Sequence, residues 1–229
     1  MAFNWTQMIP GVGEKYEHVA TLVIVTVGIF FIGTAARAAL GKGDTAILPA
    51  SKFSLRGIVE VLTETIANLA DMVIGEHGKH YVPFFSSVFF FILVNNLVGM
   101  IPGTIPATEN INTTFGFGAL IFLFYNFQGL KENGLWAYLK HFMGPIIFLA
   151  PLMFVIELVS HIVRPFSLGL RLANVMMGDH AVLSVFLDLA PIGIPIPFYM
   201  MGLFVCFVQA FVFTLLSMVY VAFAIAHDH

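Results

Sequence analysis

The sequence predicts an all-α protein that crosses a membrane several times, and its composition carries this prediction. Apolar residues make up 59% of the 229 residues, and only 10% are charged. The mean hydropathy of +0.93 lies far above that of a soluble domain. The formal net charge of −3 gives no reason to expect a nucleic-acid partner. We therefore treat residues 1–229 as a single polytopic membrane domain.

Five transmembrane helices are expected, because a helix needs roughly 20 mainly apolar residues to cross a hydrocarbon core of about 30 Å. The candidate stretches are Val19–Leu40, Val82–Ile101, Thr114–Leu130, Pro145–Leu187 and Ile192–Ala226. The fourth is too long to stand upright, since a helix over residues 145–187 would extend for about 64 Å. Steep tilt, curvature or a break would accommodate this length. We expect residues 145–226 to form a long, steeply tilted hairpin.

One further helix is expected on the membrane surface, over residues 53–75. Its apolar side chains recur at helical spacing, at Leu55, Ile58, Leu62, Ile66, Leu69 and Val73. Charged and polar residues fall between them, which is typical of an in-plane amphipathic helix. The alternative is a soluble linker helix that packs only on itself.

The basic residues of the loops predict the orientation. With five spans, one face of the membrane carries Arg37, Lys42, Lys52, Arg56, Lys79, Lys131 and Lys140, and the other carries only Lys15. Cytoplasmic loops are enriched in lysine and arginine. The N-terminal segment 1–18 is therefore expected outside, and the C-terminus in the cytoplasm.

The fourth stretch holds most of the candidate functional residues. Its ionisable side chains are Glu157, His161, Arg164, Arg171, Asp179 and His180. Such groups are costly inside a membrane and are functional hypotheses by default. Arg164 has an alternative interpretation, in which its side chain reaches toward the cytoplasmic side. For His161 the alternative is a hydrogen-bonded interface residue.

Arg171 is the most informative of these residues because arginine keeps its charge in proteins. No acidic residue lies three or four positions away from it. Its partner is therefore either Asp179, reached through a bend in the helix, or a carboxylate on another polypeptide. The alternative is an arginine satisfied by helix-end carbonyls of this chain.

Three segments carry a family resemblance: "FVIELVSHIVR", the adjoining "PFSLGLRLANVMMGDHAV", and "VQAFVFTLLSMVYVAFA". Together they resemble subunit a of the F-type ATP synthases, and the likeness extends to "PATENINTTFGFGAL" and "LVNNLVGMIP". The resemblance implies a non-catalytic stator subunit in a bacterial inner membrane that couples proton flow to rotation. Its implied partners are a ring of c subunits and the b subunits of the peripheral stalk. No cofactor and no metal are expected.

The resemblance also assigns roles to residues of this chain. Arg171 corresponds to the essential arginine that faces the rotor ring, and Gln209 to a polar residue near it on the last helix. Two half-channels are implied, a cytoplasmic one with Glu157 and Ser160, and an outer one with His180. Asn96 corresponds to an asparagine near the outer end of an earlier helix. The arginine would make each rotor carboxyl release its proton, by lowering its pKa.

The sequence departs from the family pattern at two places. Members commonly have asparagine four residues after the arginine, whereas here that position is Val175 and Asn174 comes one residue earlier. Some bacterial members carry a second titratable group where this chain has Gly202, so Asp179 is expected to work with His180 instead.

Two other function classes also place ionisable groups in mid-membrane. One is an ion-coupled secondary transporter, although the sequence has no visible internal repeat. The other is an intramembrane metalloenzyme with Glu157, His161 and His180 as ligands, although no HExxH motif occurs.

Overall fold

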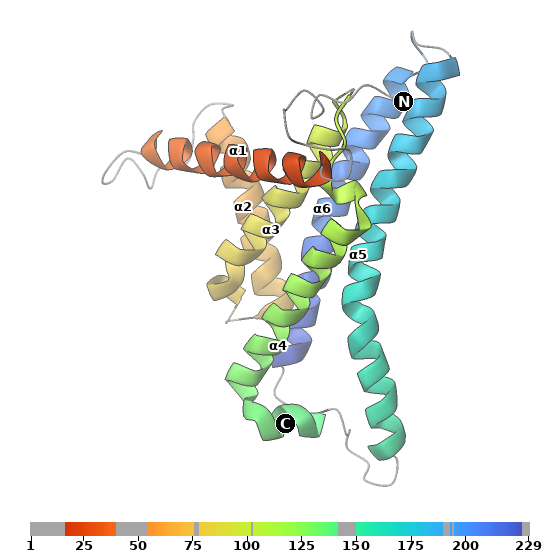
Figure 1. Cartoon of the computed structure of the whole chain (residues 1–229). Helices are drawn as coiled ribbons and strands as arrows, with labels where there is room; N and C mark the ends of the chain where they lie inside the picture. Colours follow the sequence, from red (N-terminus) through yellow and green to blue (C-terminus); the bar gives the residue numbers. More distant parts are fainter. Residues whose placement is uncertain are drawn as a thin grey trace.

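The computed structural model describes residues 17–39, 55–75, 78–101, 103–141, 150–189, 193 and 195–225, and within them the chain is helical. The elements are α1 (Glu17–Ala39), α2 (Leu55–Ile74), α3 (Gly78–Gly99), the short 3-10 helix η4 (Ala107–Glu109), α4 (Ile111–His141), α5 (Ala150–Leu189) and α6 (Pro195–Ile225) (Figure 1). The prediction of an all-α membrane protein is confirmed. Residues 1–16 of the expected external segment and 145–149 of the expected hairpin lie outside the described residues.

Four of the described helices, α1, α3, α5 and α6, are long and apolar enough to cross a membrane. They coincide with four of the five expected spans. The remaining one, Thr114–Leu130, lies within α4, which continues to His141 and contains a non-helical residue at Gly134 (φ 74°). Polar residues such as Asn126 and Gln128 lower the hydropathy of α4. Its role as a fifth span stays a prediction.

The two long helices of the expected hairpin are continuous. The 40 residues of α5 extend for about 60 Å, and the 31 residues of α6 for about 46 Å. Pro165 lies inside α5 without ending it. A break in α5 therefore does not explain how a helix of this length fits a membrane. Figure 1 shows α5 and α6 running alongside each other, with α1 lying across their direction.

Helix α2 places its predicted apolar face on the protein. Ile66 and Ala70 are fully buried, and Leu62 and Leu69 pack against the same core of α3 and α6 side chains. Ile58 differs from the prediction, because it is 50% exposed. Since α2 contacts two neighbouring helices, the interpretation as a linker helix packed only on itself is wrong.

Helices α4 and α5 approach each other through glycines. A Cβ atom on Gly118 would lie 2.5 Å from the carbonyl oxygen of Pro165, and one on Gly169 would lie 2.9 Å from that of Thr114. Small residues allow membrane helices to bring their backbones this close. This contact fixes the middle of α5 against α4.

The connection between α3 and α4 is held in place by threonine side chains. The hydroxyl of Thr104 donates to the carbonyl of Val98, in the last turn of α3, and to that of Ile101, just beyond the helix. The last carbonyls of a helix lack the regular partner that carbonyls have within it. Asn110 caps the start of α4, because its Oδ1 accepts the backbone N–H of Asn112 over 3.0 Å. Glu109, the last residue of η4, is thereby positioned two residues before α4.

Candidate functional site

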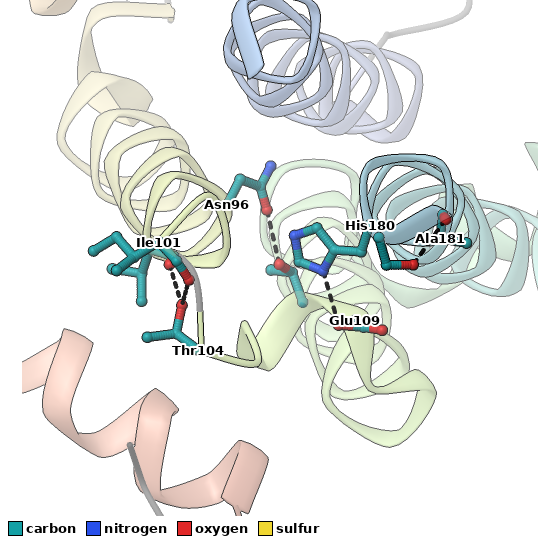
Figure 2. A network of polar contacts seen from close by, with 9 residues as sticks. Asn96, Ile101, Thr104, Glu109, His180 and Ala181 are labelled. Atoms are coloured by element: carbon teal, nitrogen blue, oxygen red, sulfur yellow. Dashed lines mark hydrogen bonds and ion pairs between the residues drawn. The ribbon is translucent and has the colours of Figure 1, made fainter. Parts of the chain in front are cut away.

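A first polar cluster joins α5 to the segment between α3 and α4. Nδ1 of His180 lies 3.0 Å from Oε2 of Glu109. The neighbouring Thr108 is fully buried, and its hydroxyl donates to Oδ1 of Asn96 over 2.8 Å. Nδ2 of Asn96 in turn donates to the backbone carbonyl of Cys206 over 3.4 Å. Figure 2 shows the His180 ring between Asn96 and Glu109. Four elements, α3, η4, α5 and α6, thus meet at this cluster.

Asp179 lies next to this cluster and faces α6. A Cβ atom on Gly202 would lie 2.7 Å from Oδ2 of Asp179 and 2.8 Å from Cε of Met100. The missing side chain at Gly202 therefore leaves room for the carboxylate. A bend that brings Asp179 to Arg171 is wrong, because α5 is continuous between them and they are about 12 Å apart along its axis.

A second polar cluster lies nearer the start of α5. Nη2 of Arg164 donates to Oε1 of Glu157 over 2.8 Å, and the Arg164 guanidinium carbon lies 5.9 Å from the ring centre of Tyr220 in α6. Nε2 of His161 lies 2.9 Å from Oδ1 of Asn126 in α4, an oxygen that can only accept. Arg164 therefore extends back along α5 to a carboxylate, and His161 is a hydrogen-bonded residue between helices.

Arg171 stands between the two clusters and is exposed. Within the part of the chain that the structure describes, it makes no ion pair and no side-chain hydrogen bond. The alternative of capture by helix-end carbonyls is therefore wrong for the described residues. Its exposed neighbours on α5 are mainly apolar, with Phe166 50% and Met177 42% exposed, and include the polar Asn174. A cation among apolar side chains is costly in hydrocarbon unless a partner meets it.

The remaining predicted site residues occupy separate places. Asn174 is exposed one turn after Arg171, and Ser160 is half-buried beside His161. Gln209 is 6% exposed on α6, and no hydrogen bond joins it to Arg171. The structure thus brings His180, Asp179 and Asn96 together in the first cluster. Gln209 is buried on α6.

Several buried polar atoms have no hydrogen-bond partner within the described part of the chain. Among the described residues these atoms belong to Ser86, Asn95, Asp179, His180 and Gln209. Three of the five are residues that the sequence analysis selected. An unpaired buried polar atom costs about 1–3 kcal/mol. Their presence favours a role in which protons or water reach these atoms.

The geometry contradicts the metalloenzyme alternative. Its three ligands, Glu157, His161 and His180, all lie on the continuous helix α5. His161 and His180 are about 28 Å apart along its axis. In the described ranges, His, Cys, Asp and Glu side chains do not gather in groups of three or more that could hold a metal ion.

Sequence analysis did not select Glu109, Thr108 or Asn126. Glu109 is 71 residues from His180 in the chain, so no local spacing connects them. One signal was available, because Glu109 is the acidic residue in the connection before α4 and an acid is favoured at a helix N-terminus.

The fold and the site define an all-helical membrane protein with polar clusters at two levels of one long spanning helix. The family model described as "ATP synthase A chain" matches residues 18–222. A protein named "ATP synthase subunit a" from Bdellovibrio bacteriovorus is 82% identical over 229 residues, which is 100% of both chains. Proteins of the same name from Geobacter sulfurreducens and Trichlorobacter lovleyi are 44% and 46% identical, over 81% and 76% of this chain and 80% and 76% of their own.

The chain belongs to the ATP synthase subunit a family. It is accordingly a membrane-bound proton-channel subunit of the F-type ATP synthase stator and is not itself catalytic. The transporter and metalloenzyme alternatives are replaced by this assignment.

Proposed function

We propose that this chain couples proton flow to rotation by holding Arg171 against a ring of c subunits, between two offset half-channels. One observation carries the proposal: Arg171 is exposed on a mainly apolar face of α5 without an ion pair among the described residues. The carboxylates of α5 that have described surroundings are used elsewhere, since Glu157 meets Arg164 and Asp179 faces Gly202. The partner of Arg171 is therefore a carboxylate on another subunit, and the c subunits supply it.

The two polar clusters are suited to be the half-channels. Along α5, Arg171 is about 21 Å from Glu157 and about 13 Å from His180. The outer half-channel comprises His180, Asp179 and Asn96, and the cytoplasmic one comprises Glu157 and Ser160. Gln209 and Asn174 are assigned to the region near Arg171. A rotor carboxylate that meets Arg171 is favoured in its ionised form. It enters lipid only after it gains a proton from the other half-channel.

A steep tilt of α5 and α6 is part of this proposal. Their lengths, about 60 Å and 46 Å, exceed a hydrocarbon core of about 30 Å. Helix α1 is long enough to span and lies across the direction of α5 and α6 (Figure 1). If α1 is perpendicular to the membrane plane, α5 is steeply tilted. Its two polar clusters are then separated from each other along the membrane plane as well as in depth. Helix α2 then lies near the membrane surface. The b subunits of the peripheral stalk are the proposed further partners of this chain in the stator.

Site-specific photocrosslinking tests the exposed face of α5 as the rotor contact. A photoreactive phenylalanine analogue at Met177, which is 42% exposed, should form an adduct with a c subunit in the assembled complex. The same analogue at Leu123 of α4, which is 67% exposed, is the matched control and should give none. Adducts from Leu123 but not from Met177 would place the ring on a different face and remove the partner proposed for Arg171.

Cysteine labelling tests the orientation, in which the connection before α4 faces outside. A cysteine at Asn110 should react with a membrane-impermeant thiol reagent added to intact cells, whereas a cysteine at Lys131 should react only after the cells are opened. The native Cys206 is fully buried and should remain unlabelled. The opposite labelling pattern would exchange the two half-channels.

A further inference from the structure

Glu109 is more accessible than the histidine that it contacts in the outer cluster. Its side chain is 30% exposed, whereas that of its partner His180 is 16% exposed. The 3.0 Å contact between Oε2 of Glu109 and Nδ1 of His180 is short enough for direct proton transfer. Thr108 and Asn96, which flank this pair, are fully buried. Glu109 thus lies on the solvent side of the imidazole ring.

The other ring nitrogen of His180 faces the interior. Nε2 is buried and has no hydrogen-bond partner in the described part of the chain. A Cβ atom on Gly99 would lie 2.9 Å from this nitrogen, so the absence of a side chain there makes room for the ring edge. The adjacent Asp179 also has a buried, unpaired carboxylate oxygen. The His180 imidazole therefore lies between the accessible carboxylate of Glu109 and the buried carboxylate oxygen of Asp179.

A permanent ion pair is a poor description of this contact. It would require a protonated ring, in which both nitrogens carry hydrogen. The Nε2–H donor of a charged ring would be buried without a protein acceptor, and an unpaired donor is more costly to bury on a charged group than on the neutral imidazole. The structural task of holding η4 is already met by Thr108, which bonds to Asn96. We therefore expect the charged form of His180 to exist only transiently.

We propose that Glu109 is the entry residue of the outer half-channel and exchanges protons with His180, an inference that rests on the function proposed above. A proton from outside binds Oε2 of Glu109 and then moves to Nδ1 of His180, which leaves a carboxylate and an imidazolium. The imidazolium releases the proton of Nε2 on the inner side, toward Asp179 and the rotor. The neutral ring then carries its hydrogen on Nδ1, and a reorientation of the side chain that exchanges the positions of the two ring nitrogens prepares it to accept the next proton from Glu109.

The test compares proton-driven ATP synthesis in Glu109→Gln, Glu109→Asp and a control, at equal amounts of assembled complex. Glutamine keeps the size and hydrogen-bonding capacity of Glu109 but cannot exchange a proton, so synthesis should fall about tenfold or more. Aspartate should retain most of the rate. Glu64→Gln makes the same change on an exposed position of α2 and should match the parent.

Parental synthesis in Glu109→Gln would overturn this inference. The proposed function would survive that result, provided that Arg171 variants fail as described below. If Glu109→Gln does not assemble, Glu109→Asp and Glu109→Asn give the same decision, because they share their length and differ in the exchangeable proton. Equal rates in these two variants would also overturn the inference.

Discussion

Arg171→Gln should abolish ATP synthesis by the assembled complex. Glutamine preserves polarity but removes the charge, which stands on the exposed face of α5 and has no ion pair among the described residues. Helix α6 offers no replacement, because Pro195–Ile225 contains no ionisable Asp, Glu, Lys or Arg. A rotor carboxyl on this face would then have no cation to favour release of its proton. The measurement is synthesis driven by an imposed proton gradient in membrane vesicles, normalised to assembled complex.

Two comparisons sharpen this prediction. Arg171→Lys should also fail, because lysine loses the planar fork of donors and readily gives up its proton when desolvated. Arg56→Gln is the matched control, since it removes an arginine whose ion pair with Glu60 is partly exposed and worth little. Near-parental synthesis in Arg171→Gln, with normal assembly, would contradict the proposed mechanism.

His180→Ala should slow ATP synthesis by about a hundredfold, the lower range for loss of a proton-transferring group. Imidazole exchanges protons near neutral pH, and His180 connects Glu109 to the interior of the outer cluster. His180→Glu should retain part of the rate, because a carboxyl also exchanges protons. The control is His80→Ala, at an exposed position of α3. A parental rate in His180→Ala would make the residue merely structural.

The helices were predictable because long apolar segments can satisfy their backbone in a membrane only as helices. The expected surface helix over 53–75 and the observed Leu55–Ile74 differ by two residues or fewer at each end. Residues 145–149 at the start of the expected fourth segment lie outside the described residues, and from Ala150 to Leu189 the segment is helical as expected. Whether tilt or a break accommodates α5 could not be read from composition, because Pro165 is compatible with either.

From residue patterns alone, the site was predictable only where one helix carries it, whereas Asn96 of α3 and Gln209 of α6 were proposed from the family resemblance. Arg171, Asp179 and His180 stand out because charges are rare in an apolar segment. Contacts between distant segments have no such signal. Glu109 reaches His180 across 71 residues, and Asn126 reaches His161 across 35. The space that Gly202 leaves for Asp179 depends on how α5 packs on α6. The spacing of residues within either helix does not predict this packing.

Passive proton flux tests the central claim most directly, because Arg171 is proposed both to trigger proton release and to separate the half-channels. The experiment removes the catalytic head and measures proton entry into vesicles that contain only the membrane sector, for the parent and for Arg171→Gln. The proposal predicts that Arg171→Gln, although inactive in synthesis, still conducts protons, because protonated rotor sites can pass between the half-channels without the cation. A proton-tight Arg171→Gln sector of normal assembly, or one that still supports synthesis when the head is restored, would contradict it.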